Sequence, residues 1–369
     1  MKRLLLGAAL AVLLAPLAAS QPWTSHRPDG HAPIGVMGDH THDAQEVMVS
    51  LRSMWMPMSG SRLGTDAIAD ADVVAPEGQN FLVTPTEMPM RMDMLGVMYA
   101  PVRRVTFMAM LPLVTMDMDH RSRMSIATDP EAIAFSTSSS GLGDVSATAF
   151  VLLAETGRSR AHVGLGASFP TGSVDQTDDT PMGEDQLLPY PMQTGSGTVD
   201  FQPSLTYLGQ SDRFGWGAQA RGTVRLGEND RSYALGNRAG LTGWASVLLT
   251  DAFSLSTRLD GQAWDNVTVA DGLEAGEAGF PYGMGVANRL VPTVFPDLRA
   301  GERVDLSVGL NAMVPSGALD GLRAAVEVGV QSVQRARRHH RIQAHREVDA
   351  LARPQVREDG RDEPVGDAH

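Results

Sequence analysis

Segments of about ten residues in which apolar and polar side chains alternate recur along most of this chain. In 304–314, for example, Val304 and Leu306 alternate with Asp305 and Ser307. A period of two is typical of β-strands, because successive side chains of a strand point to opposite faces. The pattern therefore predicts strands that each have one apolar face and one polar face.

The chain contains eleven segments of this kind, and each is predicted to be one strand. The strands are expected at 45–57, 88–99, 104–116, 143–155, 161–170, 198–208, 213–226, 239–250, 253–265, 303–314 and 321–333.

The gaps between these segments are alternately short and long. The short gaps contain 100–104, 156–160, 209–213, 250–252 and 315–321, and the long gaps cover 59–86, 119–142, 171–197, 227–238 and 267–302. Tight turns on one side and longer loops on the other are typical of transmembrane β-barrels. A soluble β-sandwich is the alternative for regularly spaced strands, but its loops need not alternate in length. We therefore predict an all-β fold, an antiparallel transmembrane β-barrel over 45–333, whose apolar face meets lipid and whose closed pairing satisfies the backbone.

Eleven is an odd number, whereas single-chain bacterial barrels normally have an even number of strands. We therefore expect a barrel of the twelve-strand type that has lost its last strand. The tail over 334–369 is basic, then acidic, and does not alternate. It is either a disordered tail or the product of a frameshift. The frameshift is considered because permitted codons from Val333 onward can encode an alternating strand in another reading frame.

The first twenty residues predict export. Lys2 and Arg3 precede an apolar run that ends in the small residues Ala18–Ser20, which is typical of a cleaved signal peptide over 1–20. An uncleaved N-terminal anchor is the alternative. No later stretch is apolar for long enough to form a membrane helix. Residues 21–44 are then a periplasmic segment, and the outer membrane, its lipid and its assembly machinery are the expected location and partners.

Charge and composition exclude several classes of function. The formal net charge is −13, which disfavours binding to nucleic acid. The chain has no cysteine, which excludes disulfides and thiolate zinc sites. It also contains no G-x-S-x-G, H-E-x-x-H or P-loop motif, so we do not expect an enzyme.

Methionine occupies every second position in the sequence T-E-M-P-M-R-M-D-M-L of 86–95. Because Leu95, Val97 and Tyr99 take the outward face of this strand, the methionines are expected on the lumen face, and the strands before and after it follow the same rule. One hypothesis is that methionine is an adaptable apolar filler. Another is that the thioethers are soft ligands for Cu(I) or Ag(I). A track for a hydrophobic solute is the third.

The N-terminal segment strengthens the metal hypothesis, because it combines several histidines with Met37 and Asp39. Imidazole suits copper and zinc, although any single histidine here can equally be a surface residue. His120 is a further candidate at the opposite mouth of the barrel. The candidate metal ligands are His31, Met37, His40, His42, Met90, Met92, Met94, Met108, Met110, Met116, Met118 and His120. No resident cofactor is predicted, and copper is the metal that this set suggests.

Charged side chains on the polar faces of the strands are expected to line the pore. They are Arg52, Arg221, Arg225, Arg258, Asp260, Asp305, Arg323 and Glu327. Both signs are present, so the set does not predict ion selectivity, and bracing of the wall is the simplest role for such pairs.

Several motifs together resemble a known family. They are H-A-P-I-G-V-M-G-D-H-T-H, M-x-M-x-M-L-G-V-M-Y-A-P, S-S-S-G-L-G-D-V, S-F-P-T-G-S-V-D, L-P-Y-P-M-Q-T-G-S-G-T-V-D and R-L-G-E-N-D. Over about 31–330 the chain resembles Gram-negative outer-membrane proteins that are described as transporter-like and are related to the channel of the MetA phenol-degradation pathway. The resemblance implies an outer-membrane barrel with a transport role and supplies no catalytic residues. This chain departs from the family after Val330, where such proteins would finish with a membrane strand ending in an aromatic residue.

The expected function is that of an outer-membrane channel or transporter that handles soft metal ions through a methionine-lined lumen. The alternatives are a channel for small hydrophobic or aromatic solutes and a non-conducting metal-binding surface protein.

Overall fold

The computed structural model describes residues 23–123, 133–269, 291–317 and 321–336. The predicted signal peptide (1–20) and the part of the predicted tail after residue 336 lie outside the described residues, so both stay predictions. Within the described residues, no helix is long and apolar enough to cross a membrane.

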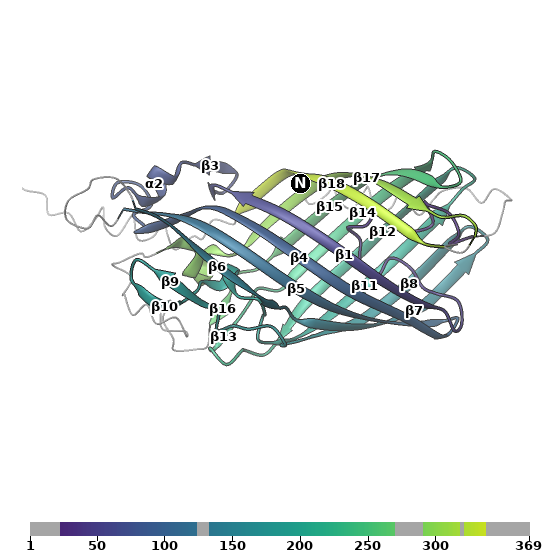
Figure 1. Cartoon of the computed structure of the whole chain (residues 1–369), viewed down its shortest axis with the longest axis horizontal. Coiled ribbons are helices and arrows are strands. Elements are labelled where there is room, and N and C mark those ends of the chain that lie inside the picture. The colour runs from purple at the N-terminus through teal and green to yellow at the C-terminus, as the bar shows by residue number, and fades with distance from the viewer. Residues whose placement is uncertain (1–22, 124–132, 270–290, 318–320, 337–369) are drawn as a thin grey trace, which may run out of the picture.

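Eleven long strands form one antiparallel sheet that curls around a central axis (Figure 1). Neighbours in the sheet follow one another in the chain, which confirms the prediction of an all-β antiparallel barrel fold. The strands are β1 (Val47–Ser59), β4 (Val83–Val102), β5 (Val105–Ser122), β7 (Val145–Thr156), β8 (Ser159–Phe169), β11 (Val199–Gln210), β12 (Phe214–Leu226), β14 (Arg238–Leu248), β15 (Phe253–Trp264), β17 (Gly301–Met313) and β18 (Arg323–Ala336).

The burial of the strands is inverted relative to that of a water-soluble protein. Large apolar side chains point outward and are exposed, such as Leu51 at 78% and Val328 at 71%. Polar side chains point inward and are buried, such as Thr206 at 0% and Asp260 at 2%. An apolar band that faces outward around a polar interior is what lipid requires of a barrel. The two faces lie where the alternation in the sequence predicts them.

Short turns join the strands at one end of the barrel, on the right of Figure 1, and the longer insertions gather at the other end. The insertions contain β2 (Ser61–Leu63), β3 (Asp66–Ile68), α2 (Asp70–Val74), β6 (Ile133–Leu142), β9 (Thr177–Thr180), β10 (Gly183–Leu187), η2 (Tyr190–Met192), β13 (Tyr233–Ala234), β16 (Thr268–Val269), η3 (Pro292–Val294) and η4 (Pro296–Leu298).

The strand β6 was not expected, because its sequence falls in the predicted loop 119–142. It pairs with the outer part of β5, from Leu113 opposite Leu142 to Ser122 opposite Ile133. Serines occupy much of β6, and in the outer part of β5 acidic residues replace the outward apolar ones. Without an apolar face toward lipid, this part of the sheet lacks the alternation that identifies the other strands.

The two terminal strands of the sheet each keep one open edge. Among the described residues β1 pairs only with β4 and β18 pairs only with β17. The described sheet therefore has a seam between the first and the last strand, and the loss of a twelfth strand stays a prediction. The last strand runs to Ala336, slightly beyond the expected end of the barrel at residue 333.

Candidate functional site

The segment that precedes β1 lies inside the barrel, where it contacts inward side chains of the wall. We call the described part of this segment, residues 23–44, the plug. The side chain of Arg52 on β1 donates hydrogen bonds to the carbonyl oxygens of Ile34 (2.9 Å) and Val36 (3.0 Å). On the last strand, Glu327 Oε2 accepts a hydrogen bond from the amide of Gly35 at 3.0 Å. The plug thus contacts both terminal strands of the sheet.

Gly38 is the tightest point of contact between the plug and the wall. It has φ of +61°, and a Cβ atom at this position would lie 2.4 Å from Cζ of Phe150. Its carbonyl oxygen lies 3.0 Å from Nε2 of the buried His162, and the neighbouring carbonyl of Met37 accepts a hydrogen bond from Gln219 at 2.9 Å. Only glycine combines the left-handed backbone with this close approach.

The first residues of the plug are fixed to the short-turn end of the barrel. Arg323 on β18 donates to the carbonyl oxygen of Arg27 at 3.0 Å and also to that of Ser25. Arg27 in turn donates to the carbonyl of Ser211 at 2.7 Å and forms an ion pair with Asp29 at 2.6 Å. The hydrogen bonds of the plug therefore reach strands in the first, middle and last parts of the sheet.

Three histidines and one aspartate of the plug lie in contact with one another. His40 Nδ1 lies 2.8 Å from Asp39 Oδ1, and His31 Nδ1 lies 3.7 Å from Asp39 Oδ2. The Nε2 atoms of His40 and His42 are 3.1 Å apart. Asp39, His40 and His42 are buried, at 2%, 6% and 7% exposure. We call these four residues the His–Asp cluster.

The net effect of burial and the neighbouring groups of the cluster is to lower the pKa of Asp39, His31 and His42. Burial by itself raises the pKa of Asp39, but His40, His31 and the amide of Ala32 outweigh it, so the pKa lies well below its usual value. Burial and the nearby His40 lower the pKa of His31 and of His42. Neutral imidazole and ionised carboxylate are the forms that bind metal ions.

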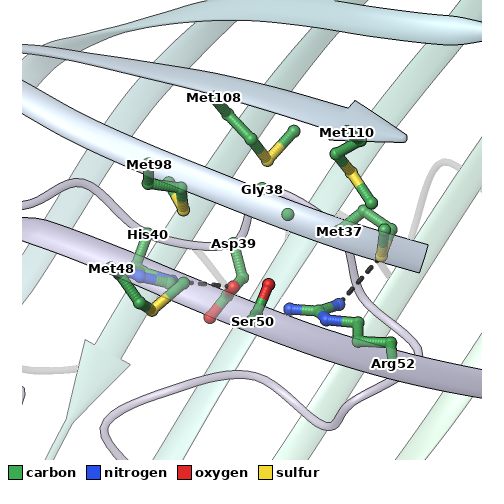
Figure 2. Close-up of a pocket in the computed structure, with 11 residues that line it drawn as sticks. Met37, Gly38, Asp39, His40, Met48, Ser50, Arg52, Met98, Met108 and Met110 are labelled. Atoms are coloured by element: carbon green, nitrogen blue, oxygen red, sulfur yellow. Dashed lines mark hydrogen bonds and ion pairs between the residues drawn. The ribbon is translucent and has the colours of Figure 1, made fainter. Parts of the chain in front are cut away.

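Next to this cluster, methionines from three strands and from the plug line a small pocket (Figure 2). The strand register aligns three of them: Met48 of β1 is opposite Met98 of β4, which is opposite Met108 of β5. We call these three residues the inner Met row. Met37, Asp39, His40 and Met110 complete this side of the pocket, and the space that remains holds about one water-sized particle.

Another methionine row lies nearer the long-loop end of the same strands. In this outer Met row, Met56 is opposite Met90, which is opposite Met116. Met90 and Met116, with Met118 beside them, pack with Leu188 and Met192 of the insertion after β8 into one apolar cluster. Met88, Met92 and Val114 belong to the same cluster. In this half of the lumen methionine acts as packing, as the filler hypothesis expects.

The charged side chains of the lumen are paired with one another or with the plug. Arg221 donates to both carboxylate oxygens of Asp260, at 2.8 and 3.0 Å. Arg258 donates to Glu327 at 2.6 and 2.8 Å. The further pairs are Arg225 with Asp200 and Arg303 with Asp305 at 3.1 Å. Together with the plug contacts of Arg52 and Arg323, these pairs contain all of the predicted pore-lining residues.

The structure separates the predicted metal ligands into groups. His31, His40 and His42 come together in the His–Asp cluster, and Met37, Met108 and Met110 line the adjacent pocket. Met90, Met92, Met116 and Met118 belong to the apolar cluster, and Met94 is buried on β4 opposite Arg52 and Pro112. His120 follows Met118 by two residues on β5 and stacks on Phe135 with the ring centroids 4.6 Å apart.

Three residues of the site were missing from the predicted ligand set. Met48 and Met98 were expected on the lumen face but were not selected, and Asp39 was noted only as a part of the segment. The alternation of β1 and β4 already places both methionines inward. Only the register of the strands shows which of the inward methionines lie side by side.

Comparison with known proteins supports the fold. Residues 97–280 match the model of a family described as "Putative MetA-pathway of phenol degradation". No curated protein matches the chain. Among solved structures, the crystal structure of an outer membrane channel from Pseudomonas putida F1 is similar, with a TM-score of 0.50 and 12% sequence identity. The match covers 82% of this chain and 93% of that chain. At this identity the likeness shows a shared fold.

Proposed function

Since the chain is related to the MetA-pathway phenol-degradation family, we propose that it is an outer membrane channel, and that its cargo is a soft metal ion, Cu(I) or Ag(I). The outward apolar band supports the location in a membrane. The fold shared with an outer membrane channel supports the transport role. The cleaved signal peptide that this location requires remains a prediction.

The observation that carries the proposal for the cargo is the pocket that the inner Met row shares with Met37 and His40 (Figure 2). Side chains directly opposite each other on adjacent strands have Cβ atoms about 4.5–5.5 Å apart, within reach of a common ion for a flexible thioether. Soft sulfur selects Cu(I) over hard cations. The pocket has room for about one water-sized particle, which is the size of a single ion.

The two methionine rows provide a matched experiment. One variant replaces the inner row by Met48→Leu, Met98→Leu and Met108→Leu, and the control replaces the outer row by Met56→Leu, Met90→Leu and Met116→Leu. Leucine keeps nearly the volume of methionine but removes the sulfur. Cu(I) and Ag(I) bound to the purified protein are measured by mass spectrometry, together with copper accumulation in cells that produce each variant.

We expect the inner-row variant to lose at least about tenfold in metal affinity and the control to keep the affinity of the unchanged protein. Equal metal binding by both variants and the unchanged protein would refute the proposal for the cargo. Equal loss in both variants would also refute it, since packing alone would then explain the effect.

A second candidate cargo is a small hydrophobic or aromatic solute. The description of the matched family names phenol degradation, and the apolar cluster around Met116, Leu188 and Met192 offers an adaptable apolar surface. This candidate predicts that uptake of labelled phenol depends on the protein and is unaffected by the inner-row variant. A non-conducting metal-binding protein would instead bind copper without transporting copper or phenol.

A further inference from the structure

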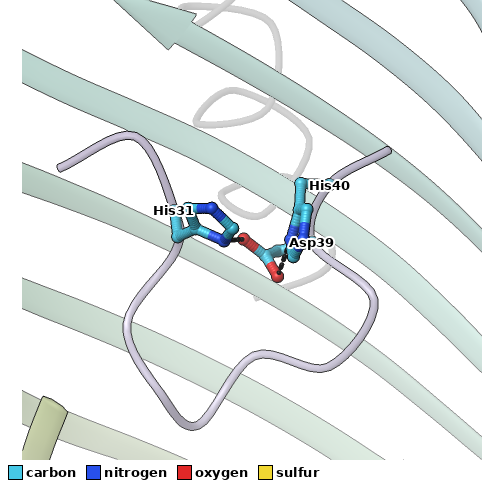
Figure 3. Close-up of side chains that lie close together, drawn as sticks. All are labelled: His31, Asp39 and His40. Carbon is cyan, nitrogen blue, oxygen red and sulfur yellow. Dashed lines mark hydrogen bonds and ion pairs between the residues drawn. The ribbon is translucent and has the colours of Figure 1, made fainter. Parts of the chain in front are cut away.

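The His–Asp cluster joins the two ends of one plug loop. His31 stands at the beginning of the loop 31–40, and Asp39 and His40 stand at its end (Figure 3). The rings of His31 and His40 are in contact, with their centroids 3.9 Å apart. Asp39 Oδ2 also accepts a hydrogen bond from the amide of Ala32 at 2.8 Å. The loop is therefore closed by side chains that are themselves good metal ligands.

The ligand atoms of His31, Asp39 and His40 all lie within 4.8 Å of one another. Zinc binds imidazole nitrogen at about 2.0–2.1 Å and carboxylate oxygen at about 2.0–2.2 Å, so tetrahedral ligands lie about 3.3 Å apart. Bringing atoms that are at most 4.8 Å apart to this spacing requires a combined movement of at most about 1.5 Å. Two imidazoles and one carboxylate suit a borderline divalent cation better than the softer Cu(I).

The surroundings also have the features of a metal site. Ligand residues are usually oriented by further hydrogen bonds, and here the Ala32 amide holds Asp39. His42 lies against Nε2 of His40, and its own Nδ1 lies 3.2 Å from Oε2 of Glu46. The cluster is enclosed by the wall of the barrel, so a bound cation would be shielded from competing water.

We propose that His31, Asp39 and His40 bind one divalent cation of the Zn²⁺ class, and that this cation locks the plug in the lumen. The loop between the ligands carries Ile34, Gly35 and Val36, which make the contacts to Arg52 and Glu327. A cation that ties the ends of the loop would reduce the freedom of the released plug and stabilise the inserted one. This site is built from nitrogen and oxygen ligands, so the inference does not rest on the proposed soft-metal cargo.

The test uses the full chain without a polyhistidine tag, folded in detergent and stripped of metal by a chelator. Zn²⁺ binding is measured by isothermal titration calorimetry for the unchanged protein, for the double variant His31→Asn/His40→Asn, and for the control His26→Asn. His26 is an exposed histidine of the same plug. We expect one Zn²⁺ per chain, an affinity at least about tenfold lower in the double variant, and unchanged binding in the control.

A second measurement covers the case in which the double variant folds poorly. Trp23 packs against Ala32 and Val36 of the plug together with Leu208 and Trp244, so limited proteolysis near residue 23 reports the release of the plug. Zn²⁺ should slow this cleavage in the unchanged protein and in His26→Asn. Zinc binding no tighter in the unchanged protein than in the double variant would overturn the proposal, as would cleavage that Zn²⁺ does not slow.

The inner-row variant separates this proposal from the proposed cargo. It should keep its Zn²⁺ site while losing Cu(I), because its three methionines are not ligands of the divalent cation. Because Asp39 and His40 also line the methionine pocket, loss of Zn²⁺ in that variant would show that both metals use one site and would overturn the proposal of a separate divalent site.

Discussion

Substitution of Gly38 by alanine is expected to release the plug from the lumen. The methyl group would lie 2.4 Å from Cζ of Phe150, and the residue would have to keep φ near +61°. The left-handed backbone costs a non-glycine residue about 1–2 kcal/mol, and overpacking of a well-packed contact costs about 1–3 kcal/mol. A total of about 3 kcal/mol would shift the equilibrium toward the released plug by about 150-fold.

The assay is single-channel conductance in planar lipid bilayers. The unchanged protein should conduct rarely, because hydrogen bonds to the wall hold the plug inside the barrel. Gly38→Ala should open far more often. Gly60→Ala is the matched control, because Gly60 also has a positive φ of +74° but a methyl group there would meet no atom within 4 Å. Equal open times for Gly38→Ala and Gly60→Ala, with both proteins folded, would show that this contact does not hold the lumen closed.

Two further predictions concern the wall of the barrel. Glu327→Gln should remove the nearer of the two carboxylates that pair with the buried Arg258, because Asp260 remains at 3.7 Å, and lower the free energy of unfolding in urea by up to about 3 kcal/mol. Asp212→Asn, in an ion pair where the aspartate is 75% exposed, should cost less than about 1 kcal/mol. Equal costs would show that the lumen pair is not effectively buried. Leu259→Arg places a charge on the outward face of β15 and should lower stability in lipid vesicles by about 2–4 kcal/mol, while Leu63→Arg in the short strand β2 should have little effect. Normal stability of Leu259→Arg in vesicles would mean that this face does not contact lipid.

Much of the barrel could be predicted from the sequence, because alternation is a local property. Each of the eleven strands shows its apolar face within about ten residues, and lipid on one side imposes that pattern directly. The strand β6 was missed for the same reason, since it pairs with a part of β5 that carries no outward apolar face. The alternation of long and short gaps likewise identified the two ends of the barrel.

The candidate site could be predicted only in part. The sequence showed that the methionines share one face and that the plug is rich in histidine, yet it could not show which of them meet. Register decides that Met48, Met98 and Met108 form one row and that Met56, Met90 and Met116 form another. The insertion after β8 then covers the outer row and leaves the inner row beside the plug.

The sequence by itself determined the strands, their faces and the polarity of the barrel wall, because a period of two depends only on neighbouring residues. The tertiary structure decided that the plug enters the lumen and that His31, Asp39 and His40 meet there. Contacts such as that between Gly35 and Glu327 join residues 292 positions apart. Their formation depends on the curvature of the whole sheet, which brings the first and last strands around the same interior, and no local pattern encodes it.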